Sequence, residues 1–297
     1  MSQIKEAITL SFLADSLALG GHWIYDQEVL KKHSWEHLQA PLIKDFHPHK
    51  QAGELTHYGD QTLVLLQSLA EKKEFDLQDF ALKWQNLFLD YSDYIDHATR
   101  ISLDNFKLGW GPEDSGSMMN DLAGAARIFP LFLLYARDLE VLEKAAQAQT
   151  AMTHKHEQVV EASSFLSRVG FALLQNPDLE KALEFGLEKE FTYLPAKKWL
   201  EKARAHLDLP ADQVLLKLGQ TCHIDEAFPA TLYLLLKFFT TPKQGLIANV
   251  LGGGDSAARG LILGFFFGLT PKGKELLSLW LPEFKLAATL KSLLDQF

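Results

Sequence analysis

The chain has 297 residues, 47% of them hydrophobic and 23% charged, which is the balance of a globular protein that can bury a sizeable core. Its formal net charge of -9, without any lysine- or arginine-rich block, excludes a protein that binds nucleic acid through the phosphate backbone. The single cysteine, Cys222, excludes an intramolecular disulfide and gives no sign of an oxidising compartment.

Apolar residues recur at helical spacing along most of the chain, and alternating stretches long enough for β-strands are almost absent. Prolines fall between the periodic segments, where each would end one helix or start the next. Because no linker or low-complexity tract divides the sequence, we predict an all-α fold in a single domain over residues 1–297. The predicted helices are Ile4–Leu19, Gln61–Lys72, Leu77–Tyr91, Leu122–Tyr135, Leu139–Met152, Glu157–Leu174, Leu179–Glu188, Ala196–Leu207, Ala211–Leu218, Phe228–Phe239 and Ser256–Gly268.

The first and last of these helices also bear on cellular location. Lys5 and Glu6 lie at the start of the first helix and Asp15 lies inside its apolar run, which is unlike a signal peptide. The apolar run Gly260–Leu269 is much shorter than the roughly 20 residues of a membrane-spanning helix. We therefore expect a cytoplasmic protein with no membrane partner.

Two polar stretches lack periodicity, from Tyr25 to Tyr58 and from Lys107 to Asp121. Long irregular segments inside compact domains are usually functional or mobile. The first contains histidines in no recognised metal-binding pattern. A solvated surface is the simpler interpretation for His33 and His37, whereas His47-Pro48-His49 lies in a loop and is a candidate for ligand contact.

Three aspartates lie at or inside apolar helices: Asp15, Asp60 and Asp255. Burial of a carboxylate among apolar side chains is costly, so such a residue caps a helix, pairs with a partner or binds a ligand. Asp60 and Asp255 precede long apolar segments, so helix capping is an alternative to a functional role for both. Asp15 lies in mid-helix, where no cap is needed. We expect Asp60 and Asp255 to face one another at the ends of neighbouring helices and to form one polar pocket.

The glycines before Asp255, from Gly252 to Gly254, allow a tight turn or the close approach of a ligand. The helix that follows them offers an anion site at its N-terminus. A dinucleotide-binding fingerprint is disfavoured, because the parallel sheet that it requires is missing from the predicted elements.

The order of these features resembles the ADP-ribosylglycohydrolase family, and the landmarks span almost the whole chain. They are Asp15 in an early helix, Tyr58-Gly59-Asp60-Gln61-Thr62, the loop and helix from Ser115 to Leu131, Thr153-His154, and Gly253 to Ala258. Three short segments resemble the sequences of a divergent branch, the J-type crystallins and selenoprotein J. They are His22–Asp26, His57–Gln61 and Asp121–Ile128. The resemblance implies a single compact orthogonal helical bundle of the ADP-ribosylglycohydrolase type.

For the metal-dependent members, the resemblance implies a tyrosine-threonine-aspartate-aspartate-threonine motif and a glycine-glycine-aspartate-threonine-aspartate-threonine motif that together hold two magnesium ions. Here Gly59 and Gln61 replace a threonine and an aspartate of the first motif, and Ala257 and Ala258 replace an aspartate and a threonine of the second. His22 lies near the position of a further acidic residue of the family. Since Mg²⁺ prefers octahedral oxygen coordination with carboxylate charge, the resemblance implies at most one Mg²⁺, on Asp60 and Asp255.

The activity implied by the resemblance is hydrolysis of an N- or O-glycosidic bond in an ADP-ribosyl or related ribosyl substrate, either a nucleotide-like small molecule or an ADP-ribosylated protein. Asp60 or Asp255 would orient or deprotonate a water molecule that attacks the anomeric carbon, with His22 or His57 as the acid or the ligand-positioning group. The expected substrate contacts are Asp15, Asp26, His57, Tyr58, Gln61, Asn120, Asp121, His154, Gly254 and Ser256.

The replaced carboxylates leave a second interpretation, a non-catalytic ligand-binding pseudoenzyme or a crystallin-like structural protein. The polar groups retained beside apolar helices favour a functional site instead. Arg127 and Arg259 lie close to the motifs and are candidates for phosphate contact, with ion pairing at the edge of the core as the simpler alternative. The local spacing leaves open whether Asn120 or Asp121 takes the place of an asparagine in the family's loop.

Overall fold

The computed structural model describes residues 2–297 and confirms the all-α fold, because no β-strand occurs in this part of the chain. Two 3-10 helices, η1 (Phe129–Leu131) and η2 (Leu281–Glu283), accompany the α-helices. The α-helices are α1 (Ser2–Leu19), α2 (Gln27–Leu30), α3 (His57–Lys72), α4 (Leu77–Leu87), α5 (His97–Lys107), α6 (Ala123–Ala126), α7 (Phe132–Tyr135), α8 (Leu139–Ala151), α9 (Glu157–Gln175), α10 (Leu179–Leu187), α11 (Ala196–Arg204), α12 (Ala211–Leu218), α13 (Ile224–Phe238), α14 (Pro242–Leu251), α15 (Ser256–Gly268), α16 (Pro271–Trp280) and α17 (Ala287–Leu294).

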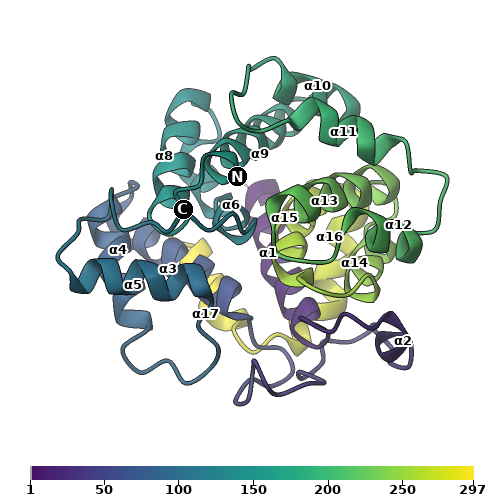
Figure 1. Ribbon diagram of the computed structural model, residues 1–297, viewed down its shortest axis with the longest axis horizontal. Coiled ribbons are helices and arrows are strands. Elements are labelled where there is room, and N and C mark those ends of the chain that lie inside the picture. Colours follow the sequence, from purple (N-terminus) through teal and green to yellow (C-terminus); the bar gives the residue numbers. More distant parts are fainter. Residues whose placement is uncertain (1) are drawn as a thin grey trace.

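Helices α1 and α15 lie side by side at the centre of the molecule (Figure 1). Helix α3 packs against α4 on one side, and α8, α9 and α10 form a second group (Figure 1). On the other side α13, α14 and α16 pack against α15, and α12 packs against α13 and α14 (Figure 1). All thirteen residues of α15 are buried, which explains why its sequence is apolar around its whole circumference. The central pair is therefore the element around which the other helices are arranged.

Three glycines on one face of α15 let α1 approach its backbone closely. A Cβ atom at Gly260 would lie 3.0 Å from the carbonyl oxygen of Ala14, and one at Gly264 would lie 2.6 Å from the carbonyl oxygen of Leu10. A Cβ atom at Gly268 would lie 2.5 Å from the Cα of Ala7. Because residue numbers rise along one helix as they fall along the other, the two helices run antiparallel. The end of α1 therefore lies beside the start of α15.

Most predicted helices are confirmed, including Ala211–Leu218 and Ser256–Gly268 with unchanged bounds. The predicted helix Leu122–Tyr135 is instead divided into α6, η1 and α7. Pro130 lies inside that stretch, and a proline lacks the N–H that would continue an α-helical ladder. The predicted helix Leu77–Tyr91 ends earlier, at Leu87.

Helix α3 starts at His57 rather than at Gln61, because Thr56 and not Asp60 is its N-cap. The threonine hydroxyl accepts hydrogen bonds from the backbone N–H groups of Tyr58 and Gly59. The alternative that Asp60 caps this helix is therefore wrong, and its carboxylate is free for other partners.

Four helices of eight or more residues, α5, α14, α16 and α17, were not predicted from the pattern of apolar residues. In α5 the buried side chains are Ala98, Thr99 and Ser102, which are small or polar and give no apolar stripe. Helix α14 starts with Pro242 at its first position, where the missing N–H costs nothing, but its apolar residues are not confined to one face.

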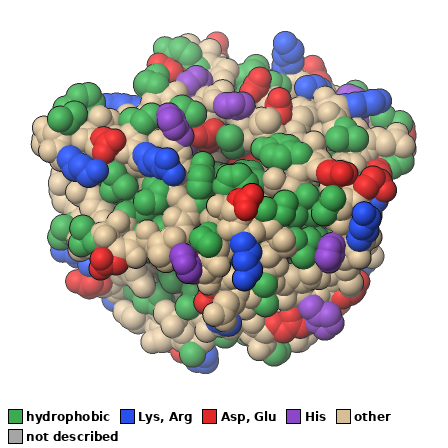
Figure 2. All heavy atoms as spheres, turned by 60° about the horizontal axis from the view of Figure 1, so that its bottom comes forward, with side chains coloured by type: hydrophobic (Ala, Val, Ile, Leu, Met, Phe, Trp, Pro, Cys, Tyr) green, Lys and Arg blue, Asp and Glu red, His purple; other side chains and the backbone are tan. Residues whose placement is uncertain are grey.

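The distribution of charged side chains on the surface agrees with the composition of the chain. On the face drawn in Figure 2, acidic, basic and histidine side chains are interspersed among apolar ones, and basic groups do not form a continuous patch. Within residues 2–297, every helix is too short or too polar to span a bilayer.

The glycine contacts generate a stability prediction. Alanine normally favours a helix over glycine by about 1 kcal/mol, but we expect Gly264→Ala to lower the free energy of unfolding by about 1–3 kcal/mol through overpacking against α1. Chemical denaturation monitored by circular dichroism measures this change, with exposed Ser278→Ala in α16 as the control. A Gly264→Ala protein that is as stable as the wild type would show that α1 and α15 are not in close backbone contact.

Candidate functional site

The antiparallel packing of α1 on α15 brings the turn after α1 against the glycine turn before α15. The N–H of Trp23 donates to the carbonyl of Gly254 at 2.9 Å, and the N–H of Gly254 donates to the carbonyl of Ile24 at 2.8 Å. Trp23 and Gly254 both have a left-handed backbone, with φ of 61° and 66°. A Cβ atom at Gly254 would lie 1.9 Å from the carbonyl oxygen of Gln220, so this position requires glycine. Two reciprocal backbone hydrogen bonds therefore join the turns.

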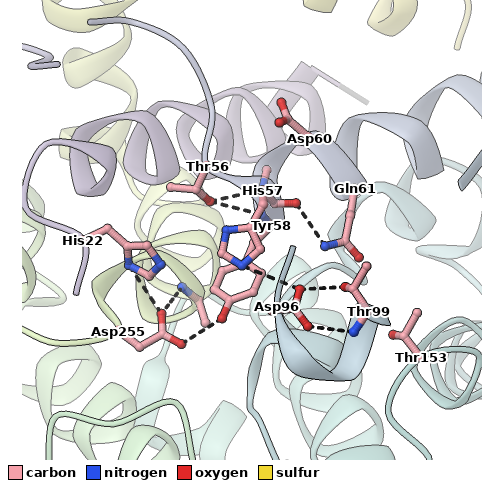
Figure 3. Close-up of polar contacts among 12 residues, drawn as sticks. His22, Thr56, His57, Tyr58, Asp60, Gln61, Asp96, Thr99, Thr153 and Asp255 are labelled. Atoms are coloured by element: carbon pink, nitrogen blue, oxygen red, sulfur yellow. Dashed lines mark hydrogen bonds and ion pairs between the residues drawn. The ribbon is translucent and has the colours of Figure 1, made fainter. Parts of the chain in front are cut away.

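Asp255 is fully buried at the start of α15. Its carboxylate accepts a hydrogen bond from the N–H of Ala258 at 3.3 Å, so the predicted capping role is confirmed. Its other oxygen accepts from the hydroxyl of Tyr58 at 3.4 Å, and Nδ1 of His22 lies 3.7 Å from Oδ1 (Figure 3). Burial raises the pKa of Asp255 to about 6. This carboxyl group can therefore exchange a proton near neutral pH.

Three histidines from separate segments meet next to Asp255. His22 follows α1, His47 lies in the irregular segment before α3, and His57 is the first residue of α3. All three are buried, and one ring nitrogen of each lies within 4.8 Å of the corresponding nitrogens of the other two. Burial lowers the pKa of His47 to about 4 and the pKa values of His22 and His57 well below their usual range. The three imidazoles are therefore neutral at pH 7.

Aromatic rings hold these imidazoles in place. The ring of Trp23 lies 4.3 Å from that of His22, and it is almost parallel to that of His47, at 7° and 6.1 Å. Tyr94 meets the indole edge-on at 4.7 Å. These contacts offset the strain of the left-handed backbone at Trp23, which non-glycine residues seldom adopt.

Asp15 fixes the start of α3. Its carboxylate accepts from the N–H of Thr56 at 2.8 Å and from the hydroxyl of Thr56 at 2.6 Å. A Cβ atom at Gly59 would lie 2.2 Å from Oδ2 of Asp15, so glycine at this motif position leaves room for the carboxylate. Burial raises the pKa of Asp15 to about 7, although both hydrogen bonds oppose this change. Asp15, which we expected to contact substrate, thus supports the segment that carries His57.

Asp60 and Asp255 do not share partners. The carboxylate of Asp60 accepts from Nζ of Lys50 at 2.5 Å and from the hydroxyl of Tyr91 at 2.6 Å. Figure 3 shows Asp60 and Asp255 on opposite sides of the first turn of α3. Burial raises the pKa of Asp60, and the charge of Lys50 opposes this effect. The two carboxylates therefore lie in separate environments and do not form the expected common pocket. A metal ion held jointly by Asp60 and Asp255 does not fit this arrangement.

Gln61 has internal partners where the family motif has a second aspartate. Its side-chain oxygen accepts from Nε1 of Trp84 at 2.8 Å and from the guanidinium of Arg127, which also donates to Thr153. A guanidinium bound at this position repels a divalent cation. Because the side-chain oxygen of Gln61 is already bound by these two donors, the expected substrate contact through its side chain is not what the structure shows.

Neither arginine near the motifs faces an open site. Arg259 is fully buried, donates from Nε to the side-chain oxygen of Asn249 at 2.9 Å, and donates from its terminal nitrogen to the carbonyl of Gly253 at 2.6 Å. Arg127 is 1% exposed. Both guanidinium groups are therefore held by internal hydrogen bonds rather than by the candidate phosphate contact.

Asn120 and Asp121 pair with a segment that the sequence did not single out. The N–H of Ile224 donates to the carbonyl of Asn120 at 2.9 Å, and Nδ1 of His223 lies 2.7 Å from the side-chain oxygen of Asn120. Asp121, Cys222 and His223 form a second group whose candidate ligand atoms lie within 4.8 Å of one another. Burial raises the pKa of Asp121. Since His223 is exposed, this group lies at the rim of the site.

The other expected substrate contacts lie in different environments. Asp26 is exposed and caps α2 by accepting from the N–H of Glu28 at 2.9 Å. His154 is buried, with Nδ1 2.9 Å from the hydroxyl of Thr153. Ser256 is buried next to Asp255, and its hydroxyl has no hydrogen-bond partner within residues 2–297.

Sequence reasoning missed Asp96, which lies beside His57. The Asp96 carboxylate caps α5 by accepting from the N–H and the hydroxyl of Thr99 at 2.8 and 2.6 Å. Nε2 of His57 lies 3.6 Å from its Oδ2 (Figure 3). The local signal for Asp96 is an aspartate immediately before a helix, but the small or polar buried residues of α5 give no apolar stripe that predicts the helix.

Comparisons with known proteins give one family and a matching fold. The model of a family described as ADP-ribosylglycohydrolase matches residues 1–297. The chain is 26% identical over 253 residues to an uncharacterized protein of Archaeoglobus fulgidus, covering 82% of this chain and 81% of that protein. It is 23% identical over 249 residues to Crystallin J1A of Tripedalia cystophora, covering 77% and 76%. Its fold matches an "ADP-ribosylglycohydrolase-related protein complex" with a TM-score of 0.69 and 19% identity, over 99% of this chain and 96% of that one.

The raised pKa of Asp15 generates a pH prediction. A buried carboxyl group whose folded pKa of about 7 exceeds its unfolded value binds protons more tightly in the folded protein. The wild type should therefore lose stability relative to Asp15→Asn as the pH rises from about 4 to 7, by an amount on the order of a few kcal/mol. Urea unfolding of both proteins at several pH values measures this difference. If the free energies of unfolding of the two proteins change in parallel with pH, the raised pKa of Asp15 is contradicted.

Proposed function

Because the chain belongs to the ADP-ribosylglycohydrolase family, we propose that it is a hydrolase that cleaves an N- or O-glycosidic bond of an ADP-ribosyl or related ribosyl substrate. The observation that supports this most is the buried carboxyl group of Asp255, whose pKa is raised to about 6 beside Tyr58 and His22. An acid or base acts best when its pKa lies near the working pH. Such a group beside neutral imidazoles is suited to glycoside hydrolysis.

In this proposal, Asp255 acts in its carboxylate form. It removes a proton from a water molecule whose oxygen attacks the anomeric carbon of the ribose, while the bond to the leaving nitrogen or oxygen breaks. The protonated Asp255 then gives up this proton to the departing group, which regenerates the carboxylate and divides the elements of water between the two products. The carboxylate of Asp121 stabilises the positive charge that develops on the sugar ring. His22 positions the water, and the hydroxyl of Tyr58 orients the Asp255 carboxylate.

We propose that the substrate enters at the rim of the site. Asn120 and Asp121 would contact the ribose, because they lie in an irregular segment that meets the exposed His223. The free hydroxyl of Ser256, next to Asp255, would take a further substrate oxygen, and Gly254 would allow the close approach of the ligand. The substrate would be a nucleotide-like small molecule or an ADP-ribosylated protein bound by one domain that comprises residues 1–297.

Asp60 has a supporting role in this proposal. Its pairing with Lys50 ties the irregular segment that carries His47 to the first turn of α3. Magnesium has no step in the proposed reaction, since the second motif carboxylate is an amide already bound by Trp84 and Arg127.

A non-catalytic protein is the second candidate. The observation that favours it is the replacement of motif carboxylates by Gln61 and Ala257, together with the similarity to a protein named as a crystallin. A pseudoenzyme of this kind would bind ADP-ribose and gain thermal stability from it without turnover.

The role of Asp255 can be tested by Asp255→Asn. Asparagine retains the ability to cap α15 but cannot accept a proton, so the fold should persist while kcat falls by about 10²- to 10⁴-fold. The assay is release of ADP-ribose from ADP-ribosylated arginine, serine and related small molecules, with thermal unfolding of each variant alongside. Exposed Asp104→Asn in α5 is the matched control and should retain wild-type activity. Absence of turnover in the wild type, without a thermal shift by ADP-ribose, would reject the hydrolase and the ADP-ribose-binding pseudoenzyme and would leave the structural protein.

The pKa of Asp255 predicts the pH profile of the wild type. Since the carboxylate is the active form, kcat/KM should rise about tenfold per pH unit below pH 6 and level off above it. Initial rates measured from pH 4.5 to 8 provide the profile. A value of kcat/KM that falls as the pH rises through 6 would assign the protonated acid, and not the base, to this residue.

A further inference from the structure

The buried histidine cluster next to Asp255 has a property that the proposed hydrolase reaction does not use. None of the six ring nitrogens of His22, His47 and His57 has a hydrogen-bond partner within residues 2–297. A buried polar atom without a partner is destabilising, and native proteins rarely leave several such atoms together. An arrangement of this kind indicates that the partner is a bound species.

We propose that His22, His47 and His57 bind one transition-metal ion, of which Zn²⁺ is the expected example. Neutral imidazole is a preferred ligand of zinc and a poor ligand of magnesium. A tetrahedral zinc site with N–Zn bonds of about 2.0–2.1 Å places its ligand nitrogens about 3.4 Å apart. The three candidate nitrogens already lie within 4.8 Å of one another, so small side-chain rotations bring them to this spacing.

Carboxylates flank two of the three histidines in the manner of metal-bound imidazoles. Nδ1 of His22 lies 3.7 Å from Asp255, and Nε2 of His57 lies 3.6 Å from Asp96. In metal sites a carboxylate commonly accepts from one ring nitrogen of a ligating histidine and leaves the other nitrogen to the ion. Here this leaves Nε2 of His22 and Nδ1 of His57 for the metal, and the two carboxylates balance its charge.

Three protein ligands would leave a fourth tetrahedral position for water. The site is formed by three segments that are remote in sequence: the turn after α1, the irregular segment before α3, and the first residue of α3. The ion would therefore also link these segments and add to the stability of the folded protein.

A second group, formed by Asp121, Cys222 and His223, competes as a zinc site because thiolate is a strong zinc ligand. However, Nδ1 of His223 already lies 2.7 Å from the side-chain oxygen of Asn120, and burial raises the pKa of the Cys222 thiol, which disfavours the thiolate. The histidine cluster has no such competing partners within residues 2–297.

The decisive experiment measures metal binding without substrate. The full-length protein is stripped with a chelator, dialysed and titrated with ZnCl₂ in a calorimeter, and its metal content is determined by elemental analysis. We expect about one Zn²⁺ per chain, which a thousandfold excess of Mg²⁺ does not displace. His47→Ala should weaken binding by more than about 100-fold, since even outer partners of metal ligands change affinity by 10- to 100-fold. His49→Ala changes a 63% exposed histidine in the same segment and should bind zinc as the wild type does.

Several outcomes would overturn the proposal. They are a wild type that binds no zinc, His47→Ala that folds and binds zinc with unchanged affinity, and loss of binding in Cys222→Ser but not in His47→Ala. Circular dichroism establishes that each variant is folded. If His47→Ala does not fold, the visible spectrum of the Co²⁺-loaded wild type decides the question, because tetrahedral ligation by nitrogen without sulfur is expected. Hydrolysis is assayed separately, so zinc binding without turnover refutes only the proposed function, and turnover without zinc refutes only this inference.

Discussion

The contact between α1 and α15 is the constraint on which the site depends. Glycines at three successive turns of α15 remove the Cβ atoms that would otherwise meet the backbone of α1. The two helices therefore approach until their antiparallel ends bring His22 to Asp255. A side chain on this face of α15 would separate the helices and part the two turns that are joined by hydrogen bonds between Trp23, Ile24 and Gly254. The chemistry of the site is thus set by an apolar helix contact that carries no reactive group itself.

Around this contact, residues of the first family motif have internal partners, and an amide stands in place of one of its carboxylates. Gln61 is bound by Trp84 and Arg127, and Asp60 is paired with Lys50. These cationic side chains occupy the positions where divalent ions would need negative charge. Asp15 has taken up the space beside Gly59 and holds the capping hydroxyl of Thr56. At Gly59 and Gln61, the lost oxygen ligand therefore coincides with a hydrogen bond that stabilises the new arrangement.

The remaining acidic and imidazole groups meet in a dry environment that changes their protonation in opposite directions. Burial raises the pKa of Asp255 and lowers that of His22, so each group tends toward its neutral form. A neutral imidazole offers a lone pair, and a carboxyl group with a pKa of about 6 exchanges protons at physiological pH. Proton transfer at the sugar and ligation of a transition metal both draw on these properties, and they use different atoms of the same cluster.

The sequence by itself determined the fold class, the existence of most of the longer helices and the identity of the motif residues. Helical spacing of apolar residues follows from which face of a helix is buried, and capping by Asp255 depends only on neighbouring backbone N–H groups, so both are local properties. Only the tertiary structure decided which polar groups share a site. Asp60 and Asp255 have the same local pattern, yet one pairs with Lys50 and the other lies beside His22. The direction of a side chain and the identity of its distant partners depend on how the helices cross. The same crossing brings His22, His47 and His57 together and places Asp96 beside His57. Such contacts join residues far apart in the chain and leave no periodic trace in the sequence.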